Sequence, residues 1–504
     1  MFETVELGRH LDKETFRREQ ARLRTELLKI QRRVEEEKLA VVILVNGVDG
    51  AGRGDVVNVI NEWMDVRNIA TVAFDTPTDE EQQRPPAWRY WMALPPAGSI
   101  AVFTGAWYTG PICRRAYGET DDADLDQEMH RIVAFERMLH DAGIHIIKLW
   151  LHISEAQQKK TFKRLRRRKE TAWRVTSRDL ENQKRYAAFR RVTARSIRIT
   201  STGDAPWIVI EAADRRYRRV EAASQVLRSI ETRLAQPAPP SGAPTPQAED
   251  PFTILDTLDL SLRLEREAYS VRLERAQARL AELSRRASSA GVGTTIVFEG
   301  ADAAGKGGAI RRIIAPLDAR HYRVIRIAAP TDEELAHHYL WRFWRHLPRL
   351  GRFTIYDRSW YGRVLVERVE GVAHRREWSR AYKEINDFEG QLVDAGILLI
   401  KFWLHISAEE QLRRFEAREK TPWKQYKITD EDYRNRDKAH AYEAAASEMV
   451  GRTSSEMAPW TLVEAEDKRY ARVKVVETVC DRLEAHLAAI DRRDEPRRKK
   501  KKKK

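Results

Sequence analysis

The sequence predicts an α/β protein of two tandem three-layer α/β/α domains, each with a parallel β-sheet covered by helices. The first observation is an internal repeat: "DAGIHIIKLWLHIS" begins at residue 141 and "DAGILLIKFWLHIS" at residue 394, an offset of 253. The second is that short apolar runs alternate with longer amphipathic stretches in each copy, which is typical of strands joined by crossover helices. The third is a glycine-rich loop between an apolar strand and a helix, at 300–308.

The expected elements follow the same order in both copies. A charged amphipathic helix precedes the first strand in each copy. In the second copy the expected elements are a helix at about 259–288, strands at 294–299 and 323–330, a helix through "YLWRFWRHLP" (339–348), a strand at 353–357, a helix at 376–394, a strand at 397–404 and, after a mainly helical region, a strand at 460–465. In the first copy the helix is expected at about 13–38 and its strand at 41–46.

A proline-rich stretch separates the copies. Residues 235–251, "AQPAPPSGAPTPQAEDP", have no strand or helix periodicity and are expected to form a semi-stiff linker. We therefore expect domains at 1–234 and 252–490. Residues 491–504 are expected to form a basic tail without folded structure.

Composition favours a globular protein with an anionic partner. No apolar run approaches the roughly 18 residues of a membrane span, and the start lacks a signal-peptide pattern. Two cysteines in 504 residues are typical of a reducing compartment, so a cytoplasmic location is expected. The formal charge is +15, and +7 remains without the eight basic residues at the C-terminus. Such a charge favours nucleic acid, anionic lipid or a phosphate polymer as the partner.

The loop from Gly300 to Lys306 has the spacing G-x-x-x-x-G-K of a phosphate loop. Glycines allow the backbone N–H groups to point inward, and the following helix adds positive potential. Lys306 would reach the phosphate that is transferred. The phosphate-binding positions expected from this loop are Gly300, Ala304, Gly305, Lys306, Gly307 and Gly308. The alternative is an ordinary tight turn between a strand and a helix.

Gly307 stands where phosphate loops usually have a magnesium-binding Ser or Thr. Magnesium would therefore need carboxylate oxygens, and Asp302 and Asp357 are the expected ligands. Asp357 comes at the end of the strand "FTIYD", where ligands bind in parallel sheets. The adjacent Arg358 could neutralise charge on the transferred group.

A basic region follows further along the chain. Residues 411–433 concentrate Arg413, Arg414, Arg418, Lys420, Lys424 and Lys427 around Trp423. We interpret this region as a lid that closes on phosphates, with Lys420 and Lys424 as further phosphate-binding residues. A solvated helix face is the alternative.

The motifs "EGADAAGKGG", "APTDEE", "YLWRFWRHLP", "YDRSWYGRVLVERV" and "LIKFWLHIS" together resemble the second family of polyphosphate kinases. The resemblance spans nearly all of 251–490 and, more faintly, 1–235. It implies a thymidylate-kinase-like P-loop fold with additional lid helices, a requirement for Mg²⁺ (or Mn²⁺), and inorganic polyphosphate as the phosphoryl donor. The two-copy layout is similar to the class that makes ADP from AMP. By this resemblance the catalytic residues are Asp302, Lys306, Asp357, Arg358 and Arg418.

The first copy departs from these motifs. At an offset of 253, Lys306 becomes Arg53, Asp357 becomes Thr104 and Arg358 becomes Gly105, while Asp302 keeps its type as Asp49. Loss of a metal ligand and of a cation predicts that the first copy is non-catalytic. Its basic stretch at 159–170 could extend a polyphosphate track, or its role could be purely structural.

Three other functions compete with this prediction. The same fold could use ADP or another nucleotide as acceptor, or run toward polymer synthesis. An ATP-dependent small-molecule kinase is the second, although the Lys-Gly pair argues against it. A nucleic-acid-binding protein is the third, but no recognisable module of that class appears. The sequence does not specify whether whole chains form a homo-oligomer.

Overall fold

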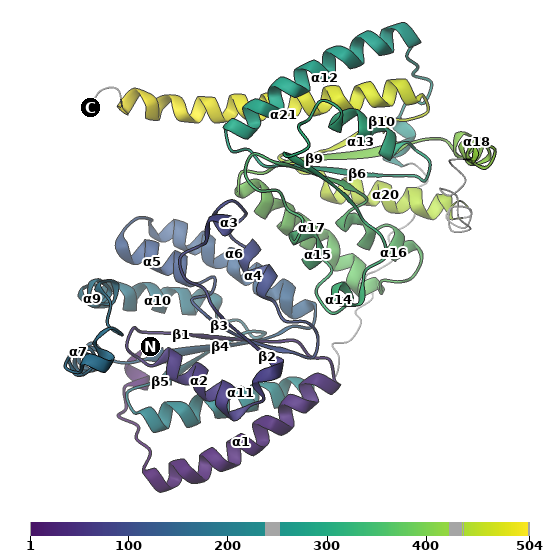
Figure 1. Ribbon diagram of the computed structural model, residues 1–504. Helices are drawn as coiled ribbons and strands as arrows, with labels where there is room; N and C mark the ends of the chain where they lie inside the picture. The colour runs from purple at the N-terminus through teal and green to yellow at the C-terminus, as the bar shows by residue number, and fades with distance from the viewer. Residues whose placement is uncertain (1, 237–252, 423–435, 437, 502–504) are drawn as a thin grey trace. The chain divides into compact units, whose positions relative to one another are not determined.

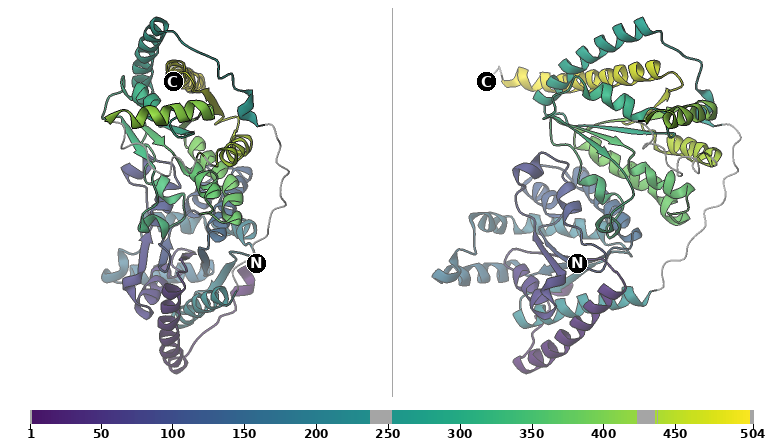
Figure 2. Two further views of the ribbon diagram at one scale, coloured as in Figure 1. Left: turned by 90° about the vertical axis from the view of Figure 1, so that its right-hand side faces the viewer. Right: turned by 45° about the vertical axis from the view of Figure 1, so that its right-hand side comes forward.

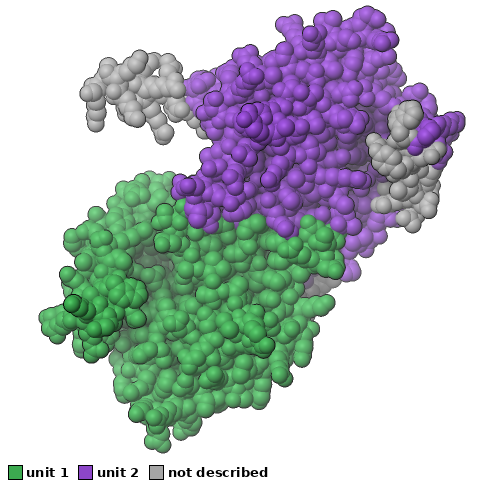
Figure 3. Space-filling model, viewed as in Figure 1, with its two compact units in different colours: residues 1–77, 89–240, 330–341 green, residues 78–88, 241–329, 342–504 purple. Residues whose placement is uncertain are grey.

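The computed structural model describes residues 2–236, 253–422, 436 and 438–501, with side chains through Arg492 (Figure 1). The chain divides into two compact units (Figure 3). Unit 1 consists of residues 1–77, 89–240 and 330–341, and unit 2 of residues 78–88, 241–329 and 342–504. Segments 78–88 and 331–341 correspond at the offset of 253, so each sequence half contributes one equivalent segment to the other unit.

Each unit contains a five-stranded parallel sheet, and the two strand orders are the same. Unit 1 has the order β2-β3-β1-β4-β5 and unit 2 the order β7-β8-β6-β9-β10. The strands are β1 (Val41–Gly47), β2 (Ile69–Ala73), β3 (Ile100–Thr104), β4 (His145–His152), β5 (Trp207–Glu211), β6 (Thr294–Gly300), β7 (Tyr322–Arg326), β8 (Phe353–Asp357), β9 (Leu398–His405) and β10 (Trp460–Glu464). The predicted fold class is confirmed.

Helices cover both faces of each sheet. The first sequence half contains α1 (Lys13–Glu36), α2 (Arg53–Trp63), α3 (Asp79–Gln82), α4 (Trp88–Ala93), α5 (Thr109–Tyr117), α6 (Asp122–Asp141), α7 (Glu155–Arg166), α8 (Lys169–Ala172), α9 (Ser177–Lys184), α10 (Tyr186–Thr200) and α11 (Arg215–Ala235). The second contains α12 (Arg266–Ser289), α13 (Lys306–Ile314), α14 (Asp332–Leu335), α15 (Trp341–Trp344), α16 (Val366–Val369), α17 (Arg375–Asp394), α18 (Ala408–Glu419), α20 (Ala439–Thr453) and α21 (Lys468–Lys501). Short 3₁₀ helices lie at η1 (Phe2–Val5), η2 (Val66–Asn68), η3 (Ile254–Thr257) and η4 (Trp360–Arg363).

In unit 2, α12, α13 and α21 cover one face of the sheet, and α17 and α20 cover the other (Figures 1 and 2). Leu280 of α12, Ile296 of β6 and Val476 of α21 are buried together on the first face. The side chains of β6 point alternately toward the two helix layers and are buried on both faces. This explains the consecutive apolar residues Ile296, Val297 and Phe298. No helix among the described residues is both long and apolar enough to cross a membrane.

Two predicted elements are shorter than expected. The strand expected at 323–330 ends at Arg326, because Arg326 pairs with Asp357, the last residue of β8. The helix expected through 339–348 is reduced to α15, in which Trp344 is fully buried against Phe388. Conversely, α21 ends at Lys501 and includes part of the basic tail that the sequence predicts to be unstructured.

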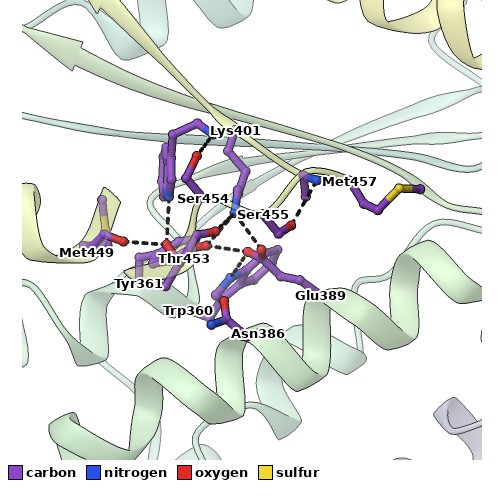
Figure 4. A network of polar contacts seen from close by, with 12 residues as sticks. Trp360, Tyr361, Asn386, Glu389, Lys401, Met449, Thr453, Ser454, Ser455 and Met457 are labelled. Carbon is purple, nitrogen blue, oxygen red and sulfur yellow. Dashed lines mark hydrogen bonds and ion pairs between the residues drawn. The ribbon is translucent and has the colours of Figure 1, made fainter. Parts of the chain in front are cut away.

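A buried polar network fixes the chain directly after β8 (Figure 4). The Lys401 ammonium donates to Glu389 at 2.7 Å, to the Tyr361 hydroxyl at 3.0 Å and to the Thr453 carbonyl at 2.7 Å. The Trp360 indole also donates to Glu389, at 3.0 Å. A buried charge pair is tolerated only when its remaining hydrogen-bonding capacity is satisfied, as it is here.

Unit 1 contains the same network. Lys148 donates to Glu136 at 2.7 Å, to Tyr108 at 3.2 Å and to the Thr200 carbonyl at 2.7 Å. Its presence in both units shows that the network belongs to the fold rather than to the chemistry of one unit.

Candidate active site

The phosphate loop follows β6 and begins with a glycine that packing requires. A Cβ atom on Gly300 would lie 2.2 Å from the Leu404 carbonyl of β9, so no larger residue fits. Gly305 adopts a left-handed conformation with φ 112° and precedes the first residue of α13, Lys306. The loop therefore ends at a helix N-terminus, where backbone N–H groups are available to an anion.

Strand pairing brings the second motif to this loop. Phe298 of β6 pairs with Asp357 of β8, so the strands end side by side. The Arg358 guanidinium donates to Asp302 at 2.8 Å. Lys306 donates to the carbonyls of Gly300 at 2.6 Å and Ala301 at 3.2 Å. Arg358, from the second motif, is thus brought to the loop that holds Asp302 and Lys306.

Arg358 lies among carboxylates. Burial by itself lowers the pKa of its guanidinium, but Asp302, Glu299 and Asp357 outweigh burial and raise that pKa. Arg358 also has φ 65°, a conformation that is uncommon for a residue with a side chain. Backbone strain of this kind is typical of functional sites, where the surrounding structure holds the residue in place.

Glu299 is a site residue that the sequence analysis did not single out. It is 5% exposed and accepts a hydrogen bond from the Ser359 hydroxyl at 2.8 Å. Burial raises the pKa of Glu299, against the lowering effects of the Ser359 hydrogen bond, Lys306 and Arg358. Comparison of the two copies could have pointed to it. At the offset of 253, Glu299 corresponds to Asn46 and Ser359 to Ala106, so this pair is specific to unit 2.

Arg414 supports the loop from below. Its guanidinium is 4% exposed and donates to the carbonyls of Ala303 at 2.9 Å, Ala304 at 3.0 Å, Ala465 at 2.7 Å and Glu466 at 2.9 Å. The sequence placed Arg414 among the cations of the lid, whereas the structure makes it a buried connection between the loop and the end of β10.

A tyrosine lies on the α20 side of the site. The Tyr442 hydroxyl donates to Glu370 at 3.2 Å. Burial raises the pKa of Tyr442, and the negative charge of Glu370 acts in the same direction, as does that of Asp302. At the offset of 253 these positions are Tyr117 and Phe189, which make an aromatic contact instead.

The remaining predicted site residues lie on α18 and its continuation, or in the phosphate loop itself. Arg418 is in the last turn of α18 and Lys420 is at the C-cap of the same helix. Lys424, Lys427 and Trp423 lie outside the described residues. The loop residues Ala304, Gly307 and Gly308 are in their expected places between Gly300 and the first turn of α13.

In unit 1, the charged side chains of the corresponding loop are paired with partners inside the unit. Arg53 donates to Asp49 at 2.7 Å, and Asn182 donates to the other oxygen of Asp49 at 2.8 Å. The strand that corresponds to β8 ends in Thr104 and Gly105, which supply neither a carboxylate nor a guanidinium.

The donor atoms in unit 2 fit a hard divalent cation. Asp302 and Asp357 offer carboxylate oxygens next to a phosphate loop, which is the ligand chemistry that Mg²⁺ prefers. No cluster of three or more His, Cys, Asp or Glu side chains among the described residues is arranged to hold a metal ion. Phosphate oxygens or water would therefore complete the coordination.

A parallel sheet with a phosphate loop at the end of its central strand, and an acid–arginine pair at the end of the next strand, defines a P-loop phosphotransferase class. The polyphosphate kinase 2 family model matches residues 10–238 and 263–490. The chain belongs to this family, with one match in each copy.

Several relatives match the chain over nearly its whole length, through both copies. The chain is 47% identical over 490 residues to the polyphosphate:AMP phosphotransferase of Pseudomonas aeruginosa, covering 96% of this chain and 99% of that protein. It is 36% identical over 460 residues to the polyphosphate:AMP phosphotransferase of Acinetobacter johnsonii, covering 88% and 91%. A crystal structure of a polyphosphate kinase 2 from Pseudomonas aeruginosa matches with a TM-score of 0.88 at 46% identity, covering 97% of this chain and 99% of that one.

Proposed function

We propose that the chain transfers the terminal phosphoryl group of inorganic polyphosphate to AMP, giving ADP and a polyphosphate shorter by one phosphate. The observation that carries this proposal is the 47% identity, over both copies, to a polyphosphate:AMP phosphotransferase. The assembly of Asp302, Lys306 and Arg358 around the loop supports it, because phosphoryl transfer depends on alignment and charge neutralisation.

The reaction needs no general base. An oxygen of the AMP phosphate is already ionised and can form a bond to the terminal phosphorus of polyphosphate. The bond from that phosphorus to its bridging oxygen breaks, and the shortened polymer leaves as an anion. Lys306 and Arg358 would bind the oxygens of the group in transfer, and the loop N–H groups would hold them in line.

We assign the resident cation as Mg²⁺, with Mn²⁺ as the alternative, held by Asp302 and Asp357. When bound, it would neutralise charge on the phosphate oxygens. Arg418 and Lys420 are assigned to the lid side of the site, together with Lys424. Unit 1 is assigned a non-catalytic role, because the residues in the places of Asp357 and Arg358 cannot perform theirs.

ADP formation from AMP, with Mg²⁺ and long-chain polyphosphate as the donor, tests the proposal. Asp357→Asn is expected to reduce kcat at least about a hundredfold, because it removes the charge of a metal ligand. Thr104→Ala, at the same position in unit 1, is the matched control and is expected to keep wild-type activity. A parallel reaction with ATP as donor completes the assay.

Three outcomes would contradict parts of the proposal. ADP formed from ATP but not from polyphosphate would contradict the donor. ATP formed from ADP, without ADP formed from AMP, would contradict the acceptor. Activity lost in Thr104→Ala and kept in Asp357→Asn would place catalysis in unit 1.

A further inference from the structure

Four basic residues lie on α13 and at the start of α21, and two of them, Arg312 and Arg472, lie next to Gly308. Arg311 and Arg312 come from α13, and Lys468 and Arg472 come from the start of α21; we call them the α13–α21 cluster. A Cβ atom on Gly308 would lie 3.4 Å from the Arg472 guanidinium, and Arg312 donates to the Gly308 carbonyl at 3.4 Å. The positive charges of Arg311 and Arg312 both act on Arg472.

Among the described residues, no carboxylate forms an ion pair with the cluster, although the charge of Glu410 acts on Lys468. The nearby carboxylates Glu410 and Glu464 pair with Arg413, Arg414 and Lys474 instead. Lys468 is exposed to solvent at the surface, yet partial desolvation and the neighbouring Arg414 lower its pKa to about 8, against the opposing charge of Glu410. Cations held this close together without a paired carboxylate favour an anion from outside the chain.

Unit 1 has a carboxylate at the same place. At the offset of 253, Gly308 corresponds to Asp55, and Lys468 and Arg472 correspond to Arg215 and Arg219. Asp55 binds Arg215 at 3.1 Å and Arg218 at 2.9 Å, and also binds Arg219. Burial opposes the ionisation of Asp55, but the three arginines prevail and lower its pKa to about 2.

The two units therefore differ in net charge around this turn. Unit 1 replaces Arg311 and Arg312 by Asn58 and Val59 and adds Asp55, so that its remaining cations are paired within the chain. Unit 2 keeps all four cations and has glycine in the place of the carboxylate. The side chains that distinguish the units here make unit 2 more positive beside α13.

We propose that the α13–α21 cluster is a subsite for the polyphosphate donor, which binds phosphates beyond the one that is transferred. Gly308 is two residues from Lys306, so the cluster continues from the phosphate loop. A polymer with about one negative charge per phosphate can occupy both places at once, whereas the single phosphate of AMP cannot. This subsite rests on the proposed function and specifies where its donor lies.

Copying the unit 1 residue into unit 2 tests the subsite. Gly308→Asp would place a carboxylate against Arg472, and the flexible guanidinium can move to accept the new side chain. Its KM for polyphosphate is expected to exceed that of Gly308→Asn, which adds the same bulk without charge, by about tenfold, equivalent to about 1.4 kcal/mol. The KM for AMP is expected to agree between the two variants.

A second pair of variants avoids any change in the loop. Arg472→Ala is expected to raise the KM for long-chain polyphosphate several-fold and to weaken its dependence on salt, because one phosphate contact is lost. Arg469→Ala removes the same charge three residues earlier on α21, where the side chain contacts the Leu264 carbonyl. This control is expected to keep the wild-type KM.

The outcomes separate the subsite from the function. A wild-type protein that makes no ADP from polyphosphate contradicts the proposed function itself. With an active wild type, equal KM values for Gly308→Asp and Gly308→Asn, together with a wild-type KM for Arg472→Ala, would overturn the subsite alone. A rise in the KM for AMP in place of that for polyphosphate would also overturn it, since the cluster would then bind the acceptor.

Discussion

In unit 2 the Arg358 guanidinium lies among Asp302, Glu299 and Asp357, and each of these four residues contributes a formal charge. In unit 1 only the aspartate of the loop remains, as Asp49, and it binds Arg53. The fold survives this change because the replaced side chains lie at the ends of strands rather than in the core. Residues that bind phosphate and residues that hold the sheet together are thus separable in this chain.

Glu299 supplies a prediction at the scale of one residue. A carboxyl whose pKa is raised by folding contributes stability that is fully present below its unfolded pKa and is lost as pH rises through its folded pKa. Wild-type protein is therefore expected to lose stability relative to Glu299→Gln as pH rises from about 4. Glutamine can still accept the Ser359 hydrogen bond, so this comparison isolates the charge.

Thermal unfolding of both proteins at a series of pH values measures this effect, and parallel curves would contradict it. The same substitution is expected to lower kcat/KM about tenfold, the effect of about 1.4 kcal/mol at the transition state. Ser359→Ala removes the hydrogen bond and keeps the charge. If Ser359→Ala lowers kcat/KM and Glu299→Gln does not, the hydrogen bond rather than the charge positions Arg358.

Spacing along the chain predicts a role for Lys306, and the missing Ser or Thr after it predicts one for Asp302, because a phosphate loop is a local pattern. In the structure, β6 pairs with β8, and Arg358 donates to Asp302 of the loop. The sequence does not single out Glu299, because it is one acidic residue in a strand that is otherwise uncharged. Arg414 was misassigned because its contacts join segments about 110 and 51 residues away, which no local pattern reveals.

At the scale of elements, the long strands and helices followed from periodicity, while the short ones did not. The region from α14 to α15 is held by buried aromatic side chains such as Trp344, and packing rather than helical propensity decides its path. Strand β7 ends where its partner β8 ends. Sequence periodicity therefore cannot predict the short elements, because tertiary contacts decide where they begin and end.

The position of the phosphate loop depends on α18 through Arg414. Arg414→Lys keeps a positive charge but cannot donate to four carbonyls, and it weakens the buried contact with Glu410. We expect a loss of about 2–4 kcal/mol in the free energy of unfolding. We also expect a lower kcat at saturating substrate, because the loop would no longer be held in one conformation.

Denaturant unfolding and steady-state kinetics check this prediction. Arg413→Lys is the matched control, since Arg413 binds the same Glu410 with a side chain that is 75% exposed. It is expected to change stability by less than about 1 kcal/mol. Equal effects of the two substitutions would show that the carbonyl contacts of Arg414 are unimportant.

At the scale of the whole molecule, the exchanged segments make each unit depend on both sequence halves. Within unit 2, the Trp88 indole donates to the Trp344 carbonyl at 3.0 Å, and Arg84 donates to the Leu347 carbonyl at 2.6 Å. Within unit 1, the Ala97 amide donates to the Ala336 carbonyl at 2.7 Å. The offset of 253 reveals the duplication, but nothing in the sequence indicates that these segments change places.

Fragments 1–240 and 241–504, produced separately, are expected to be less stable than the intact chain. Fragment 241–504 would lack the contacts of Arg84 and Trp88, and a loss of about 3 kcal/mol would lower its Tm by about 6–12 °C. Its kcat is expected to fall as well. Calorimetry and the ADP assay on each fragment and on their mixture measure both effects.

The control is an intact chain cut within residues 237–252 after folding, which keeps both segments and breaks only the connection. Its Tm is expected to match that of the uncut protein. If fragment 241–504 were as stable and as active as the cut protein, segment 78–88 would be dispensable, and the second sequence half would be a self-sufficient enzyme.

The exchange of segments between the two sequence halves also means that unit 1 cannot be completed until part of the second half has been synthesised. Unit 1 includes residues 330–341, which a ribosome adds about 100 residues after it has passed residue 240. At about 5–20 residues per second, the nascent first half waits roughly 5–20 s for the segment that completes it. During that interval its docking surface for the segment is uncovered, so chaperones would have a defined window in which to bind, and a pause in translation there would prolong it.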